Sequence, residues 1–148
     1  VEESPLPRIY REMPLPSIWE GSGNVICLDV LRAVSKTPET LELFFAEVEQ
    51  ARGAHPLLDR TVEDLKTAWS RGQDLEVEAR RLVEKMALSL QASLLLRQAT
   101  SEVAEAFCQT RLGPEGHYQL GTLPASLAHR ALQERAFQVG NLASVGGG

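Results

Sequence analysis

A glutamate stands between a tryptophan and a glycine in the stretch W-E-G-S-G-N, residues 19–24. Burial against the apolar wall of Trp19 would raise the pKa of Glu20 and make its carboxylate a stronger base. Gly21 leaves the main chain bare, so that a substrate carbonyl can accept hydrogen bonds from backbone N–H groups. The helix start that follows offers further N–H groups to a phosphate. These residues suit removal of a proton next to a carbonyl group; the alternative is a surface acid that complements the helix dipole.

The wider stretch R-I-Y-R-E-M-P-L-P-S-I-W-E-G-S-G-N-V-I-C-L-D-V-L-R, residues 8–32, resembles the segment of acyl-CoA dehydrogenases that carries their catalytic glutamate. The tryptophan before Glu20 makes it similar to the AidB-like adaptive-response flavoproteins within that family. The stretch A-E-A-F-C-Q-T-R-L, residues 104–112, extends the resemblance into the helical tail.

The resemblance implies that a glutamate removes the α-proton of an acyl-CoA thioester while a hydride passes to the N5 atom of FAD. It also implies a homotetramer, and a C-terminal helical domain that is associated with DNA. The residues that it assigns are Glu20 as catalytic base, Trp19 and Gly21 at the substrate, Ser22, Gly23 and Asn24 at the FAD, and Arg32 on the DNA surface.

The chain begins with Val1 rather than Met, so we expect it to be an excerpt of a longer polypeptide. In the family, the N-terminal helical domain and the β-domain build most of the flavin site. A base without a hydride acceptor performs no dehydrogenation, so the excerpt is expected to be inactive by itself.

Charge argues against a broad DNA-binding surface. The net charge is −5, and Asp and Glu outnumber Lys and Arg over residues 33–148 as well. DNA affinity grows with the number of phosphates neutralised, so this balance disfavours DNA. Pairing with Asp29 explains Arg32 more simply, and the basic stretch E-A-R-R, residues 78–81, is expected on a solvated face. The alternative function is a helical interaction module, from about residue 36, that binds DNA or a partner subunit.

Other chemistries have weaker support in the sequence. His55, His117 and His129 are far apart and have no ligand-spaced partners, so we expect capping or surface roles and no metal. Cys27 and Cys108 lie in apolar helical patterns and are expected to be buried free thiols in a reducing cytoplasm. No apolar run reaches the roughly 18 residues of a membrane span, so we expect a cytoplasmic protein.

Apolar residues recur at helical spacing, and alternating β-branched runs are absent. The sequence therefore predicts an all-α fold: an antiparallel bundle of about five to six helices, preceded by a Pro-rich extended arm over residues 1–16. Gly53 and Gly72 are expected to end helices. The predicted helices cover about 24–34, 37–52, 55–71, 73–99, 101–112 and 124–138.

Three regions follow from the pattern and the resemblance. Residues 1–35 are expected to be the end of an acyl-CoA dehydrogenase helical domain and to carry the glutamate motif. Residues 36–139 are expected to form an AidB-like C-terminal helical domain. Residues 140–148 read as a flexible tail, because they are small, polar and rich in glycine.

Overall fold

The computed structural model describes residues 4–18, 23–72, 75–114 and 123–142, and these ranges contain helices and no strand. The all-α prediction is confirmed for this part of the chain. The helices are α1 (Leu6–Glu12), α2 (Leu15–Ile18), α3 (Gly23–Lys36), α4 (Glu39–Val48), the 3₁₀ turn η1 (Glu49–Ala51), α5 (Pro56–Arg71), α6 (Leu75–Gln98), α7 (Ser101–Phe107), the π-helical turn η2 (Cys108–Leu112) and α8 (His129–Leu142).

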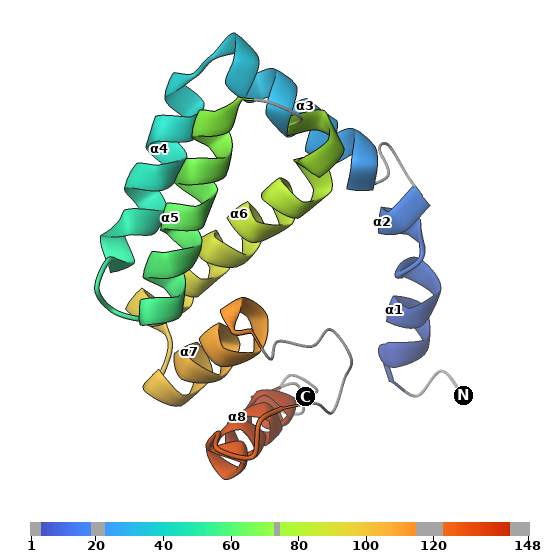
Figure 1. Ribbon diagram of the computed structural model, residues 1–148. Helices are drawn as coiled ribbons and strands as arrows, with labels where there is room; N and C mark the ends of the chain where they lie inside the picture. The colour runs from blue at the N-terminus through green and yellow to red at the C-terminus, as the bar shows by residue number, and fades with distance from the viewer. Residues whose placement is uncertain (1–3, 19–22, 73–74, 115–122, 143–148) are drawn as a thin grey trace.

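The arm before the bundle is helical, so the prediction of an extended arm is wrong for α1 and α2. Pro5 and Pro7 stand at the N-cap and in the first turn of α1, where a missing N–H removes no intrahelical hydrogen bond. Arg8 donates from Nε to Glu12 Oε1 at 3.2 Å within the same helix. Pro16 likewise lies in the first turn of α2. Figure 1 shows α1 and α2 beside the other helices, and no residue of α1 is buried.

The turns around α5 follow local signals. His55 caps this helix, because its ring Nδ1 accepts a hydrogen bond from the N–H of Leu57 at 3.1 Å. Gly53 has φ +79°, and its N–H donates to the carboxylate of Asp59 at 3.1 Å. Gly72 ends the helix with φ +65°. The predicted capping role of His55 and the predicted stops at both glycines are confirmed.

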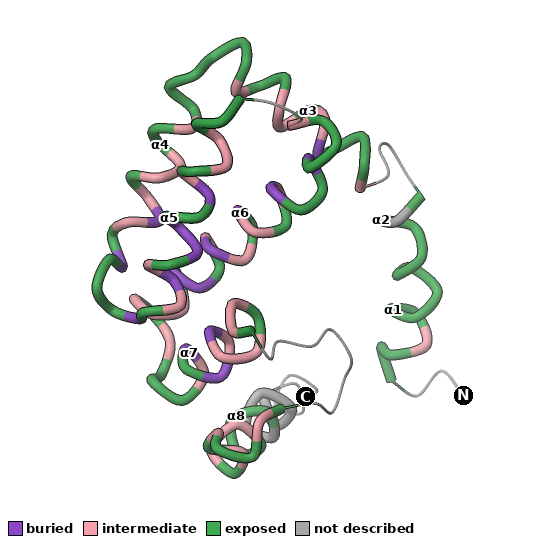
Figure 2. The backbone as a smooth tube through the Cα atoms, viewed as in Figure 1, coloured by how far each residue is buried: buried purple, intermediate pink, exposed green. Residues whose placement is uncertain are grey.

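Helix α6 is the central helix, and it contacts α3, α4, α5, α7 and both turns. Its residues Ser89, Ala92 and Ser93 are fully buried, so their small side chains let neighbouring helices approach closely. Ala87, another small residue of the same helix, is exposed. Figure 2 shows buried residues along α5, α6 and α7. The core consists of one cluster that includes Val48, Leu58, Val62, Ala92 and Cys108, and a second of Leu65, Leu82 and Met86.

The last helix begins and ends later than predicted. The N–H of Leu127 donates to the carbonyl oxygen of Pro124 at 3.1 Å, and a ring nitrogen of His129 lies 2.9 Å from the same oxygen. This turn competes with helix formation, so α8 starts at His129. The helix then continues through Gly140 to Leu142, because a glycine lowers helix stability by only about 1 kcal/mol. Residues 143–148 of the predicted tail lie outside the described residues.

Candidate functional site

The glutamate motif occupies the connection between two described helices. Helix α2 ends at Ile18 and α3 begins at Gly23. A helix start directly after the motif was predicted, and its first turn has N–H groups without intrahelical acceptors. The predicted site residues that lie outside the described residues are Trp19, Glu20, Gly21 and Ser22.

Arg80, in the first half of α6, reaches the first turn of α3. Its Nη1 donates to the side-chain oxygen of Asn24 at 2.9 Å. A Cβ built at Gly23 would lie 2.7 Å from the same Nη1, a distance too short for a side-chain carbon. The bare backbone at Gly23 therefore admits the guanidinium. As a result, a cation and the free N–H groups of a helix start lie together immediately after the glutamate motif.

Sequence reasoning assigned Gly23 and Asn24 to the site but missed Arg80. The side chain of Arg80 is exposed, as expected for the basic stretch in which it lies. Its partner Asn24 is 56 positions away, so no local pattern connects the two residues. Only the packing of α6 against α3 brings them together.

The start of α3, with Arg80 beside it, has the chemistry of a phosphate-binding site. Helix N-termini bind phosphate through free N–H groups and the positive end of the helix dipole. The guanidinium of Arg80 adds hydrogen-bond donors of a geometry that suits phosphate oxygens. Asn24 is exposed and can contribute its amide N–H₂ group. The described residues thus offer hydrogen-bond donors to a phosphate at the start of α3.

Arg32 forms an ion pair within its own helix. Its Nη1 lies 2.5 Å from Asp29 Oδ1, and both side chains are exposed. This pair was the simpler of the two explanations weighed for Arg32, and it is confirmed. The buried face of α3 instead holds Cys27, with Val30 packed against the second core cluster, whereas Val25 is exposed.

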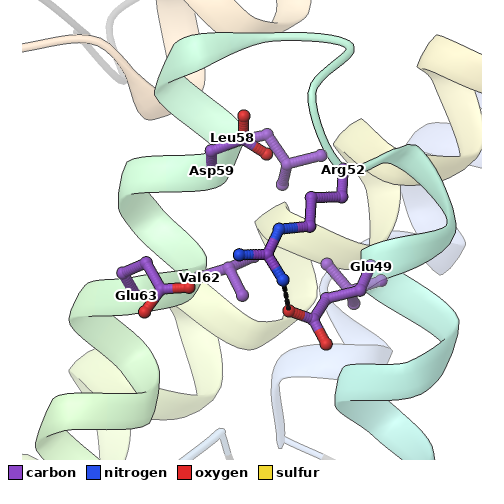
Figure 3. Close-up of a pocket in the computed structure, with 7 residues that line it drawn as sticks. Glu49, Arg52, Leu58, Asp59, Val62 and Glu63 are labelled. Atoms are coloured by element: carbon purple, nitrogen blue, oxygen red, sulfur yellow. Dashed lines mark ion pairs between the residues drawn. The ribbon is translucent and has the colours of Figure 1, made fainter.

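A small cavity of about 160 Å³ lies between η1 and α5 (Figure 3). The Nη1 of Arg52 lies 3.5 Å from Glu49 Oε1, and Lys66 Nζ lies 2.6 Å from the same oxygen. The hydrogen bond from Lys66 holds the pKa of Glu49 below its ordinary range. Leu58 and Val62, which line the cavity, belong to the core. Glu49 and Arg52 on the rim are thus paired with each other, and Lys66 ties Glu49 to α5.

Histidines and cysteines in the described ranges have structural roles. His55 is buried, and its Nε2 lies 3.2 Å from Glu105 Oε2. Cys27 and Cys108 are free and buried, as predicted, and His117 is outside the described ranges. Within these ranges, no three His, Cys, Asp or Glu side chains come close enough to hold a metal ion. None of the helices in them combines the length and apolar character needed to cross a bilayer.

Comparison with known proteins identifies the family. No protein-family model matches the chain. AidB of Escherichia coli (strain K12), whose name assigns it provisionally to the acyl-CoA dehydrogenases, is 37% identical over 119 residues. Acyl-CoA dehydrogenase family member 11 of Caenorhabditis elegans is 37% identical over 68 residues. The chain belongs to the acyl-CoA dehydrogenase family, in its AidB-like branch. The predicted membership in this family is thereby confirmed.

The AidB-like relationship extends beyond the glutamate motif. The match to AidB covers 80% of the chain, so it must include much of the helical bundle. The chain spans only 22% of the length of AidB and 11% of the C. elegans protein. What this AidB-like chain does therefore has to be argued from its own residues.

Proposed function

We propose that the chain is the C-terminal helical part of an FAD-dependent acyl-CoA dehydrogenase of the AidB type, and that Glu20 is its catalytic base. The support is the W-E-G-S-G-N motif in a chain related to AidB over 119 residues. A helix start directly after the motif, with Arg80 against it, agrees with this role. The substrate is an acyl-CoA thioester, and the assembly is a homotetramer as in the family.

Glu20 removes a proton from the carbon next to the thioester carbonyl. Trp19 excludes water from one side of the carboxylate, which strengthens it as a base. Backbone N–H groups at Glu20 and Gly21 bond the thioester oxygen, on which negative charge develops as the proton leaves. With Glu20 as the base and backbone N–H groups at the thioester oxygen, proton removal needs no second acid or base from the chain.

FAD, when bound, accepts the hydride from the β-carbon. Ser22, Gly23 and Asn24 would border it, and the start of α3 would hold its phosphates. Arg80 keeps this helix start in place through Asn24. The arrangement fixes the carboxylate relative to the cofactor, because Glu20 is only three positions before Gly23.

A conservative substitution tests the role of Glu20. In the flavin-loaded protein that carries this chain, Glu20→Gln should keep the flavin absorbance, because the amide has the shape of the carboxyl group. Bleaching of the flavin by acyl-CoA should slow by about 10²-fold or more, the contribution typical of a general base. Stopped-flow absorbance measures both.

Glu42→Gln, at an exposed position on α4, is the matched control and should bleach at the original rate. Undiminished bleaching in Glu20→Gln would reject the proposal. The same slowing in both variants would show a general effect of charge, and would reject it too.

A further inference from the structure

A groove of about 370 Å³ lies between α5, α6 and η2, and it shares no lining residue with the cavity at η1. Arg60 comes from α5, Arg81 and Lys85 from α6, and Arg111 from η2. Three elements that are far apart in the sequence thus bring four cationic side chains to one groove.

These four cations differ from most others in the described part of the chain. Arg8, Arg32, Arg52, Lys66, Arg97 and Arg130 each pair with a carboxylate. The groove cations pair with no described residue, although Asp64 and Glu84 line the same groove. In a chain with a net charge of −5, four unpaired cations in one groove indicate an anionic ligand.

The end of η2 is built so that Arg111 lines the groove. The N–H of Gly113 donates to the carbonyl oxygen of Cys108 at 3.1 Å, which closes the π-helical turn. A Cβ at Gly113 would lie 2.3 Å from the carbonyl oxygen of Gln109, so only glycine fits there. Single π-helical turns are rare, and they are frequent at functional sites. The first residue of the turn, Cys108, is fully buried, and its packing in the core holds the turn in place.

The groove suits a compact anion better than a long one. Asp64 and Glu84 interrupt its positive charge and would repel a continuous phosphate backbone. Guanidinium groups bind phosphate oxygens in pairs, and three of the four cations are arginines. Leu57, Leu88 and Leu112 supply apolar walls beside the charges.

We propose that this groove binds a small ligand with two linked phosphates, held by Arg60, Arg81, Lys85 and Arg111. Inorganic pyrophosphate and nucleoside diphosphates share this chemistry. The groove is independent of the proposed flavin site, and its binding needs neither flavin nor acyl-CoA.

The test is a titration of the 148-residue chain with inorganic pyrophosphate at low ionic strength. We expect saturable binding with a Kd below about 1 mM by calorimetry. NMR shifts should be confined to residues that line the groove. ADP should bind as well, with added shifts at the leucine walls if the natural ligand is a nucleotide, whereas inorganic phosphate should bind more weakly.

Arg60→Gln and Arg111→Gln should each weaken pyrophosphate binding by about tenfold, because each removes a charged hydrogen-bond donor. Both positions are exposed, so the variants should keep their helical circular dichroism. Arg130→Gln, on exposed α8, makes the same charge change outside the groove and should leave the Kd unaltered.

Three results would overturn the proposal: no saturable shift with pyrophosphate, equal weakening in Arg130→Gln, or shifts spread over the whole surface. Short duplex DNA is the competing ligand. If it binds at these residues and pyrophosphate fails to displace it, the groove is part of a nucleic-acid surface and the proposal is wrong.

Discussion

At the scale of single residues, Cys108 shows how burial sets reactivity. Burial raises the pKa of its thiol from an ordinary 9.0 to about 11, and the negative charge of Glu105 adds to the shift. The thiolate is the reactive form, so native Cys108 should resist thiol reagents at neutral pH. With Cys27→Ala as background, labelling by an aromatic disulfide should follow the unfolding rate. Labelling of the native protein at a rate close to that of the unfolded protein would contradict this.

The same shift predicts how stability depends on pH. The unfolded thiol ionises near 9.0 and the folded thiol near 11, so the folded state retains its proton between these values. The stabilising contribution is therefore complete below about pH 9 and is lost as pH rises towards 11. Cys108→Ala should lose this alkaline component, although it also loses packing at neutral pH. Urea unfolding of both proteins at about pH 8 and pH 10.5 measures the difference.

Residues with a neighbour close in the sequence were predictable. His55 precedes a proline at a helix start, and Arg32 follows Asp29 by three positions, so capping and pairing could be predicted from spacing. Arg80 could not, because its role depends on Asn24, which is brought to it by the packing of α3 on α6. Glu20 was found through a motif, and its catalytic role stays a prediction.

At the scale of elements, the π-helical turn depends on one glycine. Gly113→Ala should destabilise the chain by about 1–3 kcal/mol, because its Cβ would overlap a backbone carbonyl that no side-chain rotation can relieve. The change in urea midpoint measures this cost. Pyrophosphate binding in the groove should weaken in the same variant, because the turn that presents Arg111 is displaced.

Gly53→Ala is the control for Gly113→Ala, because it replaces a glycine of positive φ where a Cβ meets no other atom. Gly53 has φ +79° and open space around the position of a Cβ, so its cost of about 1–2 kcal/mol comes from the backbone alone. It should leave pyrophosphate binding intact, since it lies outside the groove. A loss of binding in both variants would assign the effect to general destabilisation.

Helix boundaries were predictable where one strong signal stood alone. Helix α5 begins at Pro56 after the N-cap His55 and ends at Gly72, as expected. Gly53 follows the end of the preceding turn η1, as expected too. Prolines misled the prediction for the arm, because those in α1 and α2 fall in first turns, which tolerate them. The π-helical form of η2 was not predicted, because a glycine after the last helical residue is equally typical of an ordinary α-helix.

At the scale of the whole molecule, the packing of α3 bears on where the stable unit begins. Helix α3 lies against α6, with Cys27 buried and Val30 against the cluster that includes Leu65. In contrast, α1 has no buried residue, and Leu6, Tyr10 and Ile18 of the arm are mostly exposed. The predicted boundary between residues 35 and 36 follows the family resemblance, whereas the packing groups α3 with the bundle.

Two truncations distinguish these boundaries. Removal of residues 1–18 should change the free energy of unfolding by no more than about 0.5 kcal/mol, because α1 buries no side chain. Removal of residues 1–36 should cost at least about 2 kcal/mol, since it removes buried Cys27 and uncovers the cluster of Leu65, Leu82 and Met86 against which Val30 packs. Urea unfolding followed by circular dichroism measures both. If the longer truncation leaves the unfolding midpoint unchanged, residues 36–139 fold without α3, and the domain boundary predicted from the sequence is the physical one.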